Sequence, residues 1–205
     1  MQSTFLKKIA AAVATVWFGM TTAQAETYVV DSRHTFPVFE VQHFNFTIQR
    51  GRFNKTSGTI QFDQTNPKQR KVSADITIDT TSVDMGFEDW NKHMRGEHFF
   101  NTDQFPTARF VIPEFQLPIE AKVYFIPGEM TLLGVTKPVT LAVMIECGKH
   151  PMLPREVCGA NIETTIRRSD FGMNYGLPGI GDEVNIIAPV EAFKEIKTAE
   201  TKIAS

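Results

Sequence analysis

The feature that most constrains the fold is an alternation of apolar and polar residues with a period of two. It runs through Val72–Asp79, Thr59–Asp63, Val139–Glu146, Ile162–Arg167 and Val184–Val190. In an extended chain this period puts alternate side chains on opposite faces, so each run predicts a β-strand with one dry face. Glycine and proline turn signals between the runs favour short antiparallel connections. We therefore predict one all-β domain of about eight strands.

One segment, Asp84–Thr102, breaks this alternation. Trp90, Met94 and His98 recur there at helical spacing and Phe99–Phe100 follows, which predicts one or two short helices. A single helical excursion in an antiparallel meander favours a closed barrel with a helical flap over a sandwich. Closure removes exposed sheet edges, and at about eight strands the interior is either filled by side chains or holds one small ligand.

Composition restricts the partners of such a barrel. The net charge of -2 and the pI near 6.2 provide no basic surface for nucleic acid or anionic lipid, so we expect no nucleic-acid partner. The chain holds 17 Phe but only three Tyr and two Trp. These phenylalanines do not distinguish a packed core from a cavity, but they make any cavity apolar.

Residues 1–25 have the pattern of a secretory signal peptide. Lys7 and Lys8 precede the apolar run Ile9–Met20, and Ala23–Ala25 provides an A-x-A cleavage site. The alternative is an uncleaved anchor, but this run is short for a bilayer core of about 30 Å. We predict cleavage after Ala25, a mature domain over 26–205, a periplasmic location and no stable membrane insertion.

The only cysteines are Cys147 and Cys158. In an oxidising compartment such a pair around a loop containing Gly and Pro predicts a disulfide. The alternatives are a metal site that includes His150, or a redox pair. Neither has C-x-x-C spacing or a second Cys/His pair in its favour.

Sequence motifs of common catalytic sites are absent. The chain has no G-x-S-x-G, no P-loop and no G-x-G-x-x-G. The stretch His93–His98 has one residue too many for the zinc signature H-x-x-E-H, and on a helix His98 would be rotated by about 100° from Glu97. We expect no enzyme, no metal and no cofactor, and interpret this stretch as a polar helix surface.

His34 and His43 flank the first long strand and allow two interpretations. They could hydrogen-bond the polar head of a ligand, or they could satisfy buried backbone groups at a corner of the barrel. The sequence leaves both open.

Five blocks in order, spread over about 180 residues from position 26 onward, resemble the YceI-like family of secreted polyisoprenoid-binding proteins. They comprise His34–Phe44 with Gly51–Phe53 and Ser57–Asp63; Lys92–Arg95 with His98–Asn101; Phe105–Phe110; Gly128–Leu141; and Arg168–Tyr175 with Gly181–Val184.

The resemblance implies a lipocalin-like antiparallel barrel with an elongated apolar cavity that binds a long isoprenoid or similar lipid, such as a polyprenyl chain, ubiquinone or a fatty amide. It implies no catalytic residue and no cofactor, and it allows a homodimer. The ligand differs between relatives, so its identity does not transfer. The Cys147/Cys158 loop resembles only a subgroup of the family.

The face to which each strand residue points, and the position of the helical flap, suggest which side chains contact the ligand. Phe39, Val41 and His43 occupy alternate positions and would point to one face of the strand, whereas Phe44 would point to the other. We therefore expect a bulge or a change of face near His43. The candidate ligand-binding residues are Phe39, Val41, His43, Phe44, Phe53, Ile60, Phe62, Ile76, Ile78, Trp90, Met94, Phe99, Phe100, Phe110, Ile112, Met130 and Leu132.

Two rival hypotheses remain at this point. The same phenylalanines could fill a packed core, which would make the chain a ligand-free structural, interaction or stress-response protein. An enzyme that acts on the bound lipid is a third possibility, although no nucleophile–base set is recognisable.

Overall fold

The computed structural model describes residues 25–196, so all but the last residue of the predicted signal peptide lies outside the described residues. Strands dominate, with one α-helix and two short 3-10 turns. The elements are β1 (Glu26–Val30), β2 (Val38–His43), β3 (Thr47–Phe53), β4 (Thr56–Asp63), β5 (Lys71–Asp79), η1 (Thr80–Ser82), β6 (Val83–Asp84), α1 (Glu88–Arg95), β7 (Thr107–Gln116), β8 (Tyr124–Leu132), β9 (Val135–Lys149), β10 (Glu156–Arg167), η2 (Arg168–Phe171) and β11 (Ile180–Lys194).

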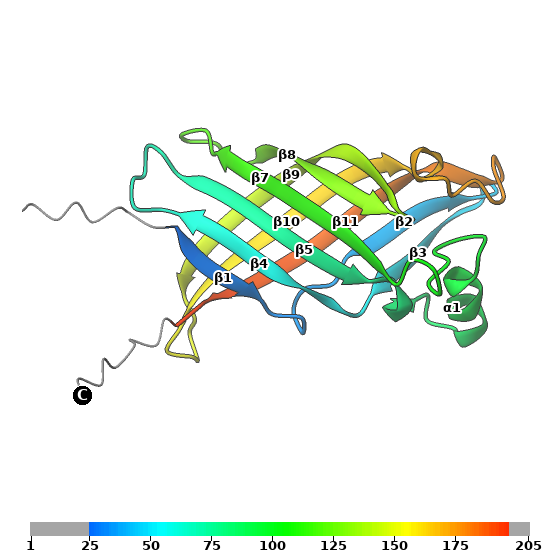
Figure 1. The fold of residues 1–205 in the computed structure, drawn as a ribbon, viewed down its shortest axis with the longest axis horizontal. Helices are drawn as coiled ribbons and strands as arrows, with labels where there is room; N and C mark the ends of the chain where they lie inside the picture. The colour runs from blue at the N-terminus through cyan, green and yellow to red at the C-terminus, as the bar shows by residue number, and fades with distance from the viewer. Residues whose placement is uncertain (1–24, 197–205) are drawn as a thin grey trace, which may run out of the picture.

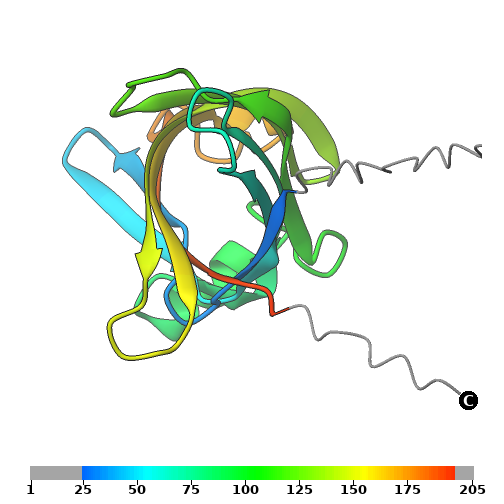
Figure 2. The ribbon, with the colours of Figure 1, turned by 90° about the vertical axis from the view of Figure 1, so that its left-hand side faces the viewer.

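A closed barrel is the main body of the molecule. Within residues 25–196 the strands form one antiparallel sheet in the order β1-β4-β5-β7-β8-β9-β10-β11-β2-β3-β6, and β1 also pairs with β11. That second pairing closes a ring of eight strands, β1, β4, β5 and β7–β11. Figure 2 looks along this ring, with α1 lying across its far end. The predicted all-β barrel with a helical flap is confirmed.

Strand β11 is shared by two partners along one edge. Its last residues pair with β1, as in Val30↔Ala192, while its first half pairs with β2, as in Val41↔Val184. The residues between β1 and β2 form no strand pairing with β11. Instead the buried Thr35 hydroxyl donates to the Glu191 carbonyl over 3.3 Å and accepts from the Glu191 N–H over 3.0 Å. The threonine side chain thus replaces a missing strand pair.

The flap follows β6 and lies at the end of the barrel opposite the start of β1 and the end of β11 (Figure 1). Its helix α1 carries Glu88 in the first turn and Arg95 in the last, which suits the helix dipole, and their side chains also pair over 2.6 Å. Met94 is its buried residue. The predicted one or two helices are therefore a single helix, followed by turns up to β7. No helix of residues 25–196 is long and apolar enough to cross a membrane.

Cys147 and Cys158 form the expected disulfide. They are direct register partners on β9 and β10, with Cα atoms 4.1 Å apart. The bridge joins the two strands of the β9–β10 hairpin, whose turn lies at the barrel end where β1 begins and β11 ends (Figure 1).

Candidate functional site: an apolar hollow along the barrel

Small side chains at inward positions leave the barrel hollow. Ala74 on β5, Ala160 on β10 and Ala188 on β11 all face the interior. Larger inward residues such as Ile60 and Ile162 remain partly exposed, although the strand ladders cover their backbone. A packed core would bury them, so the exposed area lies toward an internal space.

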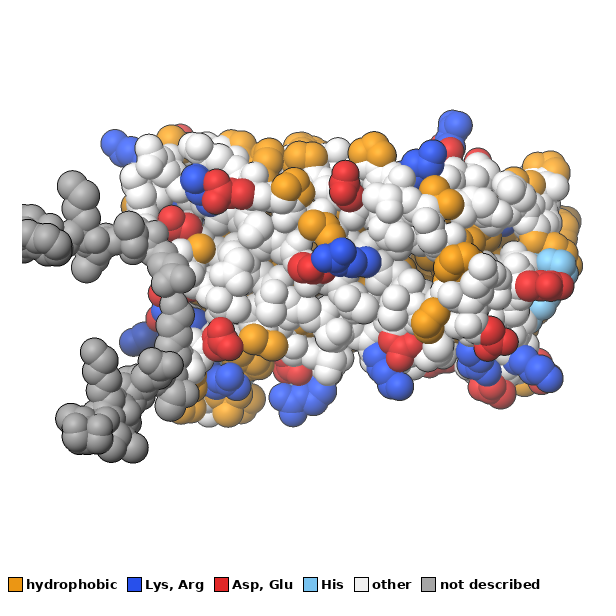
Figure 3. All heavy atoms as spheres, viewed as in Figure 1, with side chains coloured by type: hydrophobic (Ala, Val, Ile, Leu, Met, Phe, Trp, Pro, Cys, Tyr) orange, Lys and Arg blue, Asp and Glu red, His pale blue; other side chains and the backbone are white. Residues whose placement is uncertain are grey.

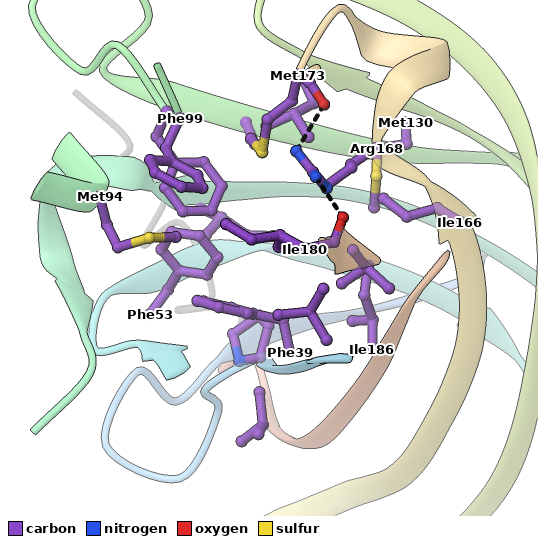
Figure 4. A pocket seen from close by; sticks show the side chains of 18 residues that line it. Phe39, Phe53, Met94, Phe99, Met130, Ile166, Arg168, Met173, Ile180 and Ile186 are labelled. Atoms are coloured by element: carbon purple, nitrogen blue, oxygen red, sulfur yellow. Dashed lines mark hydrogen bonds between the residues drawn. The ribbon is translucent and has the colours of Figure 1, made fainter. Parts of the chain in front are cut away.

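The first of two cavities lies under the flap, and we call it the flap cavity. Its volume is about 100 Å³. Figure 4 shows Phe39, Phe53, Phe99 and Met94 converging from one side, with Ile166 and other apolar side chains on the other. Phe39, Phe53 and Phe100 pack against one another with ring centroids 5.1–5.9 Å apart. Aromatic rings from β2, β3 and the flap therefore close this end of the barrel.

The second cavity, the barrel cavity, occupies the middle of the ring and reaches Cys158 near the opposite end. Its volume is about 140 Å³ and no charged residue lines it. Four residues line both cavities: Pro37, Ile78, Met130 and Ile186. They form a waist at which the two cavities adjoin, so the apolar space extends from under the flap toward the disulfide.

Arg168 is the charged residue in the wall of the flap cavity, and only 3% of its surface is exposed. Its guanidinium donates to the carbonyls of Gly181, Met173 and Ile180 over 2.7, 2.9 and 2.8 Å. Figure 4 shows the bonds to Met173 and Ile180. Burial lowers the pKa of Arg168, and the nearby charge of Asp182 opposes this effect. The donors are thus turned toward backbone oxygens, and the side chain ties the turn after η2 to the start of β11.

Fourteen of the seventeen candidate ligand-binding residues line the two cavities. Those in the wall of the flap cavity are Phe39, Val41, Phe53, Ile78, Met94, Phe99, Phe100, Met130 and Leu132. Those in the wall of the barrel cavity are Ile60, Phe62, Ile76, Ile78, Phe110, Ile112 and Met130. The structure thus brings them together on one continuous inner surface, while their contact with a ligand stays a prediction.

His43, Phe44 and Trp90 are not among the residues that line these two cavities, so for them too contact with a ligand stays a prediction. His43 ends β2, and Phe44 begins the turn to β3 with a positive φ of 50° and is 55% exposed. The expected change of face is therefore the hairpin turn itself. Trp90 is 51% exposed, because only the last turn of the short helix reaches the cavity. Figure 3 shows hydrophobic and histidine side chains on the surface at this end.

The predicted ligand-binding residues do not include the inner face of β9, β10 and β11. Leu141, Val143, Ile162, Ile166 and Ile186 line the hollow and belong to runs already identified as alternating. Their alternate positions within these runs could have identified them as inward-facing residues. The segment around Arg168 and Met173 carries no periodic signal, so only the tertiary structure places it in the wall.

The histidines lie outside both cavities. His34 is exposed and its Nδ1 lies 2.9 Å from Asp31 Oδ2. His98 stacks on Tyr175 with centroids 4.5 Å apart, and His93 packs edge-on against Phe99. Among residues 25–196 no group of three or more His, Cys, Asp or Glu side chains could hold a metal ion.

Comparison with known proteins agrees with this architecture. The model of the YceI-like domain matches residues 28–192. Protein YceI of Shigella flexneri is 35% identical over 185 residues, which cover 89% of this chain and 94% of that protein. The crystal structure of Burkholderia cenocepacia BcnA superimposes with a TM-score of 0.68 and 25% identity, over 80% of this chain and 99% of that one.

A further solved structure shares the fold alone. It is described as a polyisoprenoid binding domain from Saccharophagus degradans implicated in plant cell wall breakdown. The TM-score is 0.60 at 17% identity, and the match covers 82% of this chain and 98% of the other.

Proposed function

This chain belongs to the YceI-like family, and from that premise we propose that it binds a long-chain lipid inside its barrel and carries it in the periplasm. The lipid is an isoprenoid or a related amphiphile such as a quinone or a fatty amide. The observation that carries the proposal is the apolar hollow, in which two cavities of about 100 and about 140 Å³ adjoin at a shared waist. The description of the Saccharophagus structure as a polyisoprenoid binding domain supports the ligand class.

Burial of the lipid chain supplies the binding free energy. Each CH₂ group moved from water into such a cavity contributes about 0.8 kcal/mol. Ordering the chain and losing its translation offset part of this gain. Because apolar burial has no direction, the length and width of the hollow select the ligand more than any single contact does.

A carrier fits the interior better than the two rivals. A packed structural barrel would contain few voids larger than one water molecule, whereas both cavities exceed that size. An enzyme would need a nucleophile or a base beside the chain, and the barrel cavity is lined by apolar side chains and a few hydroxyls. The proposed protein therefore holds its lipid without transforming it.

The test is extraction of the purified protein with organic solvent, followed by mass spectrometry. The proposal predicts about one long-chain lipid per barrel, or uptake of one added prenyl lipid per barrel after delipidation. A protein that yields no stoichiometric lipid and takes up no prenyl alcohol or prenyl quinone is not a carrier of this kind. The signal peptide is tested separately by the N-terminus of the exported chain, expected at Glu26.

A further inference from the structure

The wall of the barrel cavity contains one hydroxyl that no other group satisfies. Thr56 begins β4 and is only 3% exposed. Its Oγ1 has no hydrogen-bond partner, and it is the single buried side-chain N or O atom of residues 25–196 left in that state. A buried hydroxyl without a partner destabilises the folded state, so such atoms are rare in folded proteins.

The strand directs Thr56 into the barrel. Thr56, Ile60 and Phe62 are separated by even numbers of residues on β4, so their side chains point to the same face, and all three line the barrel cavity. Its partner across the β4–β5 ladder is Ile78, which also lines the flap cavity. Thr56 therefore lies next to the waist residue Ile78. Its Oγ1 is covered by protein atoms, and a change of χ1 between staggered rotamers turns this oxygen toward the cavity without moving the strand.

The other polar side chains in this wall have partners of their own. Thr35 exchanges hydrogen bonds with the Glu191 backbone, and Thr164 Oγ1 donates to the Thr140 carbonyl over 2.9 Å. The Tyr28 hydroxyl lies 3.2 Å from Gln64 Nε2, which donates to it. Thr56 alone has both donor and acceptor capacity to spare.

We propose that Thr56 is the hydrogen-bonding point for an uncharged polar group of the bound lipid, held inside the barrel at the waist. This inference rests on the proposed lipid-binding function. A hydroxyl or carbonyl oxygen suits the site, because a threonine hydroxyl both donates and accepts. A phosphate or carboxylate does not suit it, because no charged residue lines the barrel cavity and a buried charge without a counter-charge is very costly. The favoured ligand is a prenyl alcohol, ketone or quinone rather than a prenyl pyrophosphate.

The experiment measures affinities for geranylgeraniol and for the hydrocarbon of the same skeleton without the hydroxyl, by displacement of a fluorescent lipid. The Thr56→Val variant should bind geranylgeraniol about tenfold more weakly, as expected for one lost hydrogen bond, and the hydrocarbon about as well as wild type. Thr56→Ser should retain the preference for the alcohol.

Thr164→Val is the matched control, because that hydroxyl lines the same cavity and is already bonded. It should lower thermal stability without changing the alcohol-to-hydrocarbon affinity ratio, while Thr56→Val should be at least as stable as wild type. If Thr56→Val leaves that ratio at the wild-type value, the inference about Thr56 is wrong and lipid binding stands. If wild type binds neither probe, the proposed function itself fails and the inference with it.

Discussion

At the scale of single residues, Arg168 shows how a charge is accommodated beside an apolar cavity. A buried guanidinium without a paired carboxylate is stable only if its N–H groups are satisfied. Of the three carbonyls that it contacts, that of Met173 lies just after η2, and those of Ile180 and Gly181 lie at the start of β11. The same contacts fix the cavity wall and leave the carbon atoms of the side chain toward the ligand space.

Replacing Arg168 with Met should lower the free energy of unfolding by about 3 kcal/mol, because three backbone carbonyls lose their donors together. Urea denaturation measures the effect. The matched control is the exposed neighbour Arg167→Met, which should change stability by no more than about 0.5 kcal/mol. Equal stability of the two variants would show that Arg168 does not tie the turn after η2 to β11.

At the scale of elements, the connection between β1 and β2 depends on Asp31 as well as on Thr35. Asp31 accepts hydrogen bonds from the backbone and side chain of Arg33, and His34 lies within hydrogen-bond distance. Burial raises the pKa of Asp31, but the bonds to Arg33 and His34 outweigh it and hold the pKa at about 2. The folded state therefore favours the ionised carboxylate.

A carboxylate with a lowered pKa stabilises the fold above its unfolded pKa near 3.8, and this stability is lost as the pH falls through about 2. We expect Asp31 to contribute about 1–2 kcal/mol at neutral pH, reduced by solvent screening of the exposed Arg33. Unfolding of wild type and Asp31→Asn should differ by this amount at pH 6 and converge toward pH 2. A difference that is constant with pH would contradict the assignment.

The disulfide acts on the β9–β10 hairpin. Replacing Cys147 and Cys158 together with Ser should lower the free energy of unfolding by about 2–3 kcal/mol, since the bridge restricts a short loop in the unfolded chain. Thermal unfolding with and without reductant checks this. Reductant should destabilise wild type and leave the double variant unchanged. A wild type indifferent to reductant would show that the bridge does not stabilise the fold.

Local periodicity predicts elements, but not their long-range partners. The alternation in Val72–Asp79 and Ile162–Arg167 is enough to assign strands. The alternate positions of residues such as Phe62 and Phe110 show which face of the strand points inward. It does not reveal that β11 is shared between β1 and β2, because that pairing joins residues more than 100 positions apart. Helical spacing placed Trp90 on a helix, as the structure does, but did not reveal that its side chain is about half exposed.

At the scale of the whole molecule, the hollow follows from where small residues fall on the inner face. Ala160 and Ala188 are smaller than their inward neighbours Ile162 and Ile186, and Gly128 on β8 leaves room for the ring of Phe110. A Cβ at Gly128 would lie 2.6 Å from that ring, so the large side chain packs over the strand instead of crossing the barrel. Closure of the sheet keeps the barrel intact around this space.

The most direct test of the central claim fills the barrel cavity from one strand. Ala160→Phe adds a ring inside the cavity, while Asn161→Phe adds the same ring on the exposed face of β10. With both variants verified as folded by circular dichroism, titration with a fluorescent prenyl lipid should show at least about tenfold weaker binding for Ala160→Phe and wild-type affinity for Asn161→Phe. Equal affinity of the two variants would mean that the lipid does not lie in the barrel.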